Sequence, residues 1–148
     1  MTNSGGRSSG ARVVVGGADA DLDSRLSSEL DADNTAASGV DDQRSFTVRA
    51  EDGAGQLLAG LSGWTWGTCA GVDMVWVRAD RRGSGVGADL LAAAEQVGRD
   101  RGCHRLTVSS FTFQAPSFHE RDGFVETGRT DAFPVEGHAD VHFMKVLV

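Results

Sequence analysis

The spacing of apolar residues predicts a strand and then a helix at the start of the chain. The β-branched run at 12–15 (RVVV), closed by two glycines, is typical of a short first strand. Residues 19–37 are acidic and alanine-rich, and Leu22, Leu26 and Leu30 recur every four residues. This period predicts one amphipathic helix whose leucine stripe packs in the core.

From residue 45, the spacing of apolar residues shortens to every second position, which is typical of strands. Three runs separated by glycine turns predict an antiparallel meander of strands at 45–50, 56–66 and 72–78. The helical period returns from residue 86, with Gly102 at the C-cap position. The remaining elements are a strand at 104–111, a short helix at 114–122, and strands at 123–128 and 139–148. The order β-α-β-β-β-α-β-α-β-β predicts one α/β domain over 11–148, after a disordered Gly/Ser-rich tail at 1–10.

Composition narrows the class of protein. The 148 residues carry 14 Lys and Arg against 21 Asp and Glu, and this net charge of −7 argues against a nucleic-acid partner. No apolar run is long enough to span a bilayer and the N-terminus is polar, so we expect no membrane partner and no signal peptide. Two cysteines make no disulfide framework, so we expect the reducing cytoplasm. The two cysteines and four histidines show no ligand spacing, so we predict no metal. Tyrosine is absent, which removes one common acid or base.

The glycine-rich loop at 82–88 combines features that bind anions. Arg82-x-x-Gly85-x-Gly87 follows a strand and opens a helix, and glycines let backbone amides approach an anion closely. A P-loop needs Gly-Lys-Ser/Thr at this point, and a Rossmann fingerprint needs a βαβ unit where this chain has three hairpin strands. Taken alone, the loop is equally typical of a tight glycine turn with no ligand.

Three other motifs accompany this loop. Residues 115–124 read A-P-S-F-H-E-R-D-G-F, residues 133–138 read F-P-V-E-G-H, and residues 63–67 read G-W-T-W-G. Together with the loop, they resemble the GNAT superfamily of acetyl-CoA-dependent N-acetyltransferases, in particular a group of small bacterial members. The resemblance covers about 11–148. It implies a mostly antiparallel sheet with splayed fourth and fifth strands, flanked by helices.

The same resemblance implies a cofactor site. In the family, the fourth strand pairs through its backbone with the pantetheine arm, which here assigns Val75, Trp76 and Val77. The loop that follows binds the pyrophosphate of coenzyme A, which assigns Arg82, Gly83, Ser84, Gly85, Val86, Gly87 and Ala88. Thr112 stands where the family often has an asparagine that contacts the cofactor arm. The expected co-substrate is acetyl-CoA.

Candidate catalytic and acceptor residues follow partly from the family and partly from strand parity. His119 replaces the tyrosine that usually protonates the leaving thiolate in the family, although it also fits a histidine without a catalytic part. Asp73 is the one carboxylate inside its strand and by parity faces the same way as Val75 and Val77, so it is a candidate base or cation contact. The alternative is a solvent-facing aspartate. Trp64 and Trp66 share one face and line the acceptor pocket or pack the sheet.

These observations predict an N-acetyltransferase that moves acetyl from acetyl-CoA to a primary amine of a small molecule or peptide. The net charge of −7 favours a cationic small acceptor. The alternative is a regulatory module that binds acyl-CoA but is catalytically weak or inactive, which the residues at 112 and 119 favour. The apolar last strand favours the edge of a homodimer.

Overall fold

The computed structural model describes residues 10–114 and 116–148, so almost all of the predicted tail at 1–10 lies outside the described residues. The chain divides into two compact units, residues 1–39 and 40–148. The first unit contains one helix, α1 (Ala20–Ser38), as predicted. Asp19 caps it by accepting a hydrogen bond from the Leu22 amide at 2.9 Å, and Gly39 ends it in the left-handed conformation.

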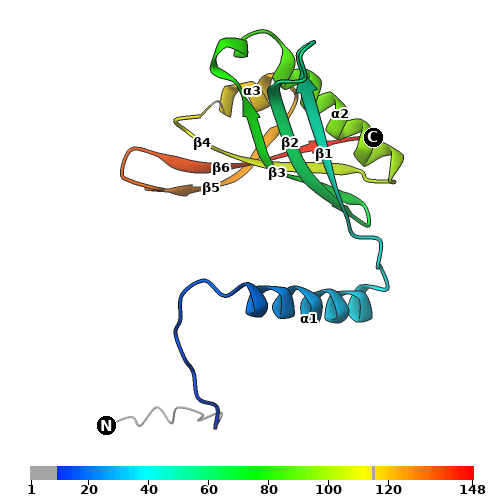
Figure 1. The fold of residues 1–148 in the computed structure, drawn as a ribbon, viewed down its shortest axis with the longest axis vertical. Helices are drawn as coiled ribbons and strands as arrows, with labels where there is room; N and C mark the ends of the chain where they lie inside the picture. The colour runs from blue at the N-terminus through cyan, green and yellow to red at the C-terminus, as the bar shows by residue number, and fades with distance from the viewer. Residues whose placement is uncertain (1–9, 115) are drawn as a thin grey trace. The chain divides into compact units, whose positions relative to one another are not determined.

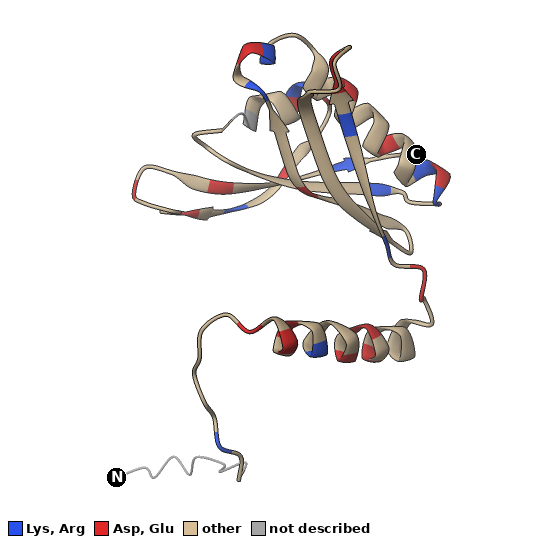
Figure 2. Cartoon of the chain, in the orientation of Figure 1, with Lys and Arg blue, Asp and Glu red and all other residues tan. Residues whose placement is uncertain are grey.

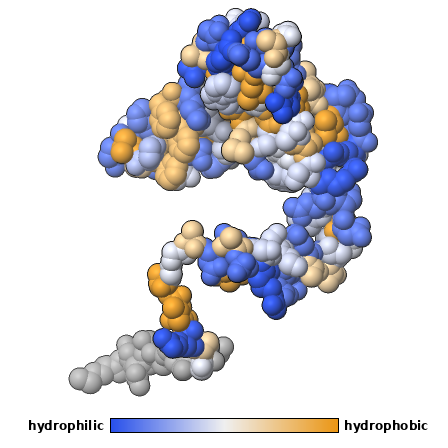
Figure 3. Space-filling model, in the orientation of Figure 1, coloured by the Kyte–Doolittle hydropathy of each residue, from blue (hydrophilic) through white to orange (hydrophobic). Residues whose placement is uncertain are grey.

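One prediction for the first unit is wrong. Residues 12–15 form no strand, and the valines of this run are exposed, in the N-terminal segment whose orange surface is visible in Figure 3. The stripe of Leu22, Leu26 and Leu30 meets no core within the first unit itself, where α1 has no buried residue, and its packing in a core stays a prediction. A β-branched run forms a strand only where another strand pairs with it. The leucine stripe lies on a helix whose other positions are rich in acidic residues (Figure 2).

The second unit is one six-stranded sheet with helices (Figure 1). Its order is β1-β2-β3-β4-β6-β5, and only the β3–β4 pair is parallel. Every strand predicted after residue 44 is present, as β1 (Arg44–Glu51), β2 (Leu57–Trp66), β3 (Cys69–Val77), β4 (Arg105–Phe111), β5 (Val125–Asp131) and β6 (Ala139–Val146). The helical elements are η1 (Ala79–Arg81), α2 (Val86–Asp100) and α3 (Pro116–Arg121).

The sheet opens in its middle. Strands β3 and β4 pair over only three positions, the last of which joins Gly71 to Thr107, and they then diverge (Figure 1). The predicted order counts residues 12–15 as its first strand, so β3 and β4 correspond to its fourth and fifth strands. The predicted splay of these two strands is therefore confirmed. The prediction that the last strand is an edge strand available to a dimer is wrong. Strand β6 lies between β4 and β5, so its backbone is already paired on both sides.

Helix α2 covers one face of the sheet and forms the core with it. Its buried residues Leu90, Leu91 and Ala94 pack in one cluster with buried side chains of the sheet, among them Phe46, Leu61, Leu106, Val141 and Phe143. The helix is amphipathic with a clear apolar face, as its sequence period predicts. No helix in the described part of the chain combines the length and apolar character needed to cross a bilayer.

A charge cluster joins α2 to the last strand. The buried Glu95 carboxylate accepts hydrogen bonds from the Lys145 ammonium at 2.5 Å and from Arg99 at 3.3 Å. Arg99 also donates to the Leu147 carbonyl at 3.0 Å, and Asp122 lies 3.7 Å from Lys145. Lys145 is the only lysine of the sequence, and it is held among these groups.

Candidate active site

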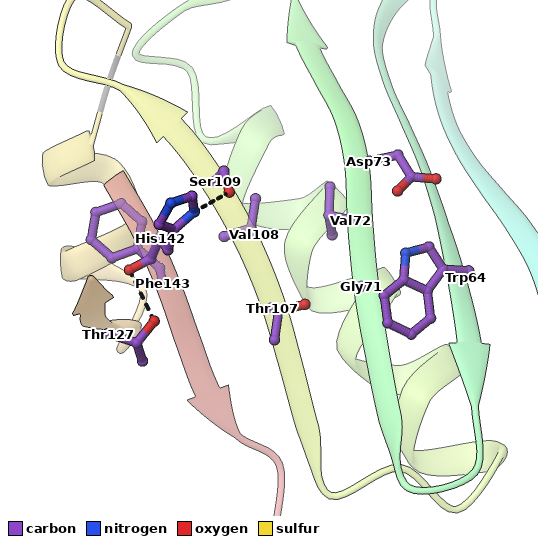
Figure 4. Close-up of a pocket in the computed structure, with 10 residues that line it drawn as sticks. All are labelled: Trp64, Gly71, Val72, Asp73, Thr107, Val108, Ser109, Thr127, His142 and Phe143. Carbon is purple, nitrogen blue, oxygen red and sulfur yellow. Dashed lines mark hydrogen bonds between the residues drawn. The ribbon is translucent and has the colours of Figure 1, made fainter. Parts of the chain in front are cut away.

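A cavity of about 330 Å³ opens where β3 and β4 diverge. It lies at the last β3–β4 pair, and five strands contribute to it (Figure 4). Its lining residues are Trp64, Gly71, Val72, Asp73, Thr107, Val108, Ser109, Thr127, His142 and Phe143. An opening in the middle of a sheet gives a substrate access to groups on several strands at once.

Asp73 lines this cavity because β3 contains a β-bulge. In the pairing with β2, Gly63 lies opposite Val72 and Ser62 lies opposite Met74, which leaves Asp73 as the extra residue. The bulge interrupts the alternation of side chains along the strand. Asp73 is exposed beside Gly71, whereas Val75 and Val77 pack against the core cluster. The prediction that Asp73 faces the same way as these valines is therefore wrong, although its place in a pocket was among the predicted alternatives.

The two tryptophans of β2 lie on the face opposite the core, but of the two only Trp64 lines the cavity. Buried and half-buried residues alternate along β2, which puts Trp64 and Trp66 on one face, as predicted. The Trp64 ring lies directly over Gly71, where a Cβ would come within 2.4 Å of it. Trp66 is absent from the cavity lining, and its indole donates a hydrogen bond to the Val40 carbonyl at 3.2 Å.

Sequence reasoning missed the polar pair on the opposite wall. Ser109 on β4 and His142 on β6 are partners in the antiparallel register, and Ser109 Oγ and His142 Nδ1 share a hydrogen bond of 2.9 Å (Figure 4). The Thr127 hydroxyl, at a bulge in β5, donates to the His142 carbonyl at 3.3 Å. Only the pairing of β4 with β6, thirty-three residues apart in sequence, brings this serine and histidine together.

The glycine loop leads into α2 as predicted. Gly83 and Gly85 have φ angles of 76° and 90°, and a Cβ at either position would meet nothing within 4 Å. Gly85 is the N-cap of α2, so the amides of Val86 and Ala88 in the first turn have no intrahelical acceptor. The Ser84 amide and hydroxyl are both used by the Arg81 carbonyl, at 3.2 and 2.5 Å. The Arg82 amide donates to the Ala79 carbonyl at 3.4 Å, so the open positions of the loop are those of Gly83 and Gly85.

Three other predicted cofactor residues have partners within the protein. A Cβ on Gly87 would lie 3.0 Å from the Phe118 ring, so this glycine allows α3 to pack on α2. The Arg82 guanidinium donates to the Val77 carbonyl at 3.4 Å. The Thr112 hydroxyl accepts from the Ala139 amide at 3.0 Å and shares a 3.3 Å hydrogen bond with a histidine ring nitrogen. Thr112 therefore joins the end of β4 to the start of β6.

The predicted strand segment for the cofactor arm is the diverging end of β3. Val75 and Val77 turn their side chains toward the core cluster, and Trp76 is half exposed on the other face. The pairing of this segment with β4 ended at Gly71, so its edge toward β4 carries no β4 partner. An extended chain would find backbone donors and acceptors there.

His119 lies apart from the cavity lining, on α3. It is 3% exposed and touches the rings of Phe118, Phe124 and Phe143, with centroids 5.4 to 5.7 Å away. Burial lowers the pKa of this imidazole, so it is neutral at pH 7. Its Nδ1 is buried and has no hydrogen-bond partner within the described residues. His119 is therefore a neutral imidazole, able to donate or accept one hydrogen bond, among aromatic rings beside the core.

Comparison with known proteins decides the family. The model of the acetyltransferase (GNAT) family matches residues 18–124. The chain belongs to the GNAT acetyltransferase family. This confirms the predicted family, the predicted fold and the prediction of an acetyltransferase enzyme. Within the described residues, no group of three His, Cys, Asp or Glu side chains is arranged to hold a metal.

Several GNAT relatives are similar over most or half of their length. Acetyltransferase Atu2258 of Agrobacterium fabrum is 31% identical over 75% of this chain and 81% of its own. The blasticidin-S acetyltransferase of Streptomyces morookaense is 42% identical over 47% of this chain, and the match spans about half, 52%, of that relative. The crystal structure of a protein assigned as an acetyltransferase, from Agrobacterium tumefaciens, superposes with a TM-score of 0.82 at 28% identity, covering 92% of this chain and 98% of its own.

A more distant structure carries the co-substrate expected for the family. The Bacillus anthracis protein assigned as a streptothricin acetyltransferase was solved in complex with acetyl coenzyme A. It superposes with a TM-score of 0.60 over 69% of this chain and 62% of its own. At 19% identity, this likeness shows the shared fold.

Proposed function

We propose that this GNAT protein transfers the acetyl group of acetyl-CoA directly to a primary amine of a small cationic molecule. The observation that carries this proposal is the cavity at the divergence of β3 and β4, with the carboxylate of Asp73 on one wall and the indole of Trp64 beside it. A carboxylate next to an aromatic face suits an ammonium group. The blasticidin-S relative makes an antibiotic amine the first acceptor to test.

The cofactor side of the proposal rests on the glycine loop. Gly83 and Gly85 leave open space, and the first turn of α2 adds free amides and the positive end of a helix dipole. These features fit a pyrophosphate. Val75, Trp76 and Val77 would pair with the pantetheine arm through their backbone, which leads the thioester toward the opening between β3 and β4. Thr112 would act beside this arm only if its hydroxyl exchanged one of its present partners.

Transfer requires a neutral amine, a polarised thioester and a stabilised thiolate. Two groups in the cavity can take the ammonium proton, namely Asp73 and the pair formed by Ser109 and His142. His119 is our candidate donor to the leaving thiolate. Because burial lowers its pKa, it would act as a neutral N–H donor, and not as an imidazolium.

Isothermal titration with acetyl-CoA tests the cofactor site. We expect binding by the wild-type protein and none by Gly85→Glu, which brings a side chain and a negative charge into the pyrophosphate position. Gly102→Glu is the matched control, because Gly102 also has a left-handed φ, 81°, and open space, but lies beyond the other end of α2. Equal loss of binding in both variants, or no binding by the wild type, would contradict the proposed site.

A thiol-release assay separates the enzyme from the alternative, an inactive acyl-CoA-binding module. The acceptor panel contains blasticidin S, streptothricin, an aminoglycoside, a polyamine and a lysine-containing peptide. Turnover with at least one small cationic amine, and less with the peptide, supports the proposal. Acetyl-CoA binding without turnover of any amine would favour the module. Cytoplasmic location and a homodimer stay predictions from the sequence.

A further inference from the structure

We infer that Ser109 and His142 form the proton relay that deprotonates the acceptor amine, while Asp73 holds its charge. This inference deepens the proposed function and rests on it. The first observation is position. Ser109 lies two residues beyond Thr107 on β4, and Asp73 lies two residues beyond Gly71 on β3, where Gly71 and Thr107 are the last pair before the strands diverge. Both residues line the same cavity (Figure 4).

The second observation is that the pair is built into the sheet. Ser109 and His142 are register partners, so their side chains lie side by side on one face, and the hydrogen bond of 2.9 Å joins Oγ to Nδ1. The Thr127 hydroxyl holds the backbone of His142 from the neighbouring strand. Strand residues with fixed partners keep catalytic groups in place better than loop residues do.

The third consideration is chemical. A free imidazole binds a proton about 400-fold more tightly than an aspartate carboxylate, so it removes a proton from an alkylammonium at a lower cost. A carboxylate is better suited to hold that cation as an ion pair. The cavity supplies one of each, on opposite walls.

The acceptor ammonium gives one proton to Ser109 Oγ while the Ser109 hydroxyl proton passes to His142 Nδ1. This leaves a neutral amine, an intact serine hydroxyl and an imidazolium. The amine lone pair then forms the N–C bond to the acetyl carbonyl, and the C–S bond breaks with its electron pair on sulfur. The acetylated nitrogen loses its second proton to water, and the thiolate leaves protonated or as the anion.

Among the described residues, few titratable side chains share the face of the sheet that carries His142. On the strands beside His142, the titratable side chains of the same face are Asp140 on β6 and Arg105 on β4, with Asp73 across the opening on β3. Strand β5 contributes Thr127 to the cavity and pairs Gly128 and Thr130 with His142 and Asp140, and none of these three β5 residues titrates. Variants of Asp73 are therefore the necessary comparison for any pH dependence assigned to His142.

The test measures kcat/KM against pH for the best acceptor of the panel, with blasticidin S first, in His142→Asn and Ser109→Ala. Asparagine keeps a hydrogen-bonding group near the Nδ1 position but cannot take the proton. We expect a loss of about 100-fold or more at pH 7, the usual range for a general base. The loss should shrink as pH approaches the pKa of the acceptor amine, because an amine that is already neutral needs no base.

Three controls accompany these variants. Ser109→Thr retains the hydroxyl and should recover most of the kcat/KM that Ser109→Ala loses, and Asp73→Asn should raise KM for the amine with a smaller change in the pH profile. The affinity for acetyl-CoA should stay unchanged in every variant, which also reports that each one folds. A loss of kcat/KM below threefold in His142→Asn, or an equal loss at every pH, would overturn the relay. The proposed function would still hold in that case, provided that the wild type turns over an amine. Absence of wild-type turnover with every amine would instead remove the proposed function and the relay with it.

Discussion

Replacing Gly71 by alanine should destabilise the protein through a single side chain. A Cβ at this position would lie 2.4 Å from the Cε2 and Cζ2 atoms of Trp64, whereas carbon atoms in contact keep about 3.5–4.0 Å. The indole must therefore move by more than about 1 Å, and overpacking of this kind costs roughly 1–3 kcal/mol. Because Trp64 and Gly71 both line the cavity, we also expect KM for the acceptor to rise, with the affinity for acetyl-CoA unchanged.

Removing the indole should reverse the sign of this effect. A Trp64→Ala background removes the three atoms nearest to the added methyl group, and alanine is better than glycine inside a strand by about 0.5–1 kcal/mol. A double-mutant cycle should then give a coupling free energy between about 1.5 and 4 kcal/mol. Gly60→Ala on β2 is the control, because its Cβ would meet its neighbours at 3.7 Å or more, and it should be neutral or stabilising.

Urea unfolding followed by circular dichroism measures all four members of this cycle without relying on tryptophan fluorescence. The cycle is interpretable if the denaturant slope stays constant among the variants. Gly71→Ala as stable as the wild type, or additive free energies in the cycle, would refute the packing of Trp64 on Gly71 and the cavity wall built from it.

The other predictions concern buried and partly buried polar groups. Lys145→Met should lower the free energy of unfolding by about 2–4 kcal/mol, because it leaves the buried Glu95 with one weaker partner, while Arg25→Gln at an exposed ion pair should change it by less than about 0.5 kcal/mol in the same urea assay. Burial raises the pKa of the Asp122 carboxyl, so the folded protein is favoured while this carboxyl is protonated. That contribution to stability is lost as pH rises above about 3.8. Asp122→Asn should therefore be more stable than the wild type at pH 7 and lose this advantage in acid. Burial lowers the pKa of His119, so stability should fall as pH drops below about 6.5, and His119→Phe should flatten that dependence in thermal unfolding scans. If His119 donates to the thiolate, His119→Tyr should keep kcat while His119→Phe lowers it, and equal kcat values in both would remove His119 from the mechanism.

The elements that could be predicted from the sequence are those with a strong local period. The alternation in β2 and the amphipathic face of α2 depend on side chains within one element, and these elements begin and end within a few residues of the prediction. The run at 12–15 was predicted as a strand from β-branched residues alone. Propensity could not reveal that the structure gives this run no paired strand.

The candidate site was predictable only where it is local in sequence. The glycine loop and its helix are contiguous, so their anion-binding geometry could be predicted from spacing. The orientation of Asp73 depends on a bulge whose extra residue is defined only by pairing with β2. The pair of Ser109 and His142 depends on the register of β4 with β6, and no short motif in the sequence encodes that register.

The charge cluster around Lys145 has a consequence for the chemistry of the protein toward its own proposed co-substrate. Acetyl-CoA acylates exposed lysine amines without any enzyme, and such reactions consume the reagent and alter the surface. Here the only lysine amine of the sequence is mostly buried, hydrogen-bonded to Glu95 and close to Asp122, so these groups shield it from the thioester. The side chains of this chain therefore offer the thioester almost no competing amine, and amine-directed labels or crosslinkers will find little to react with.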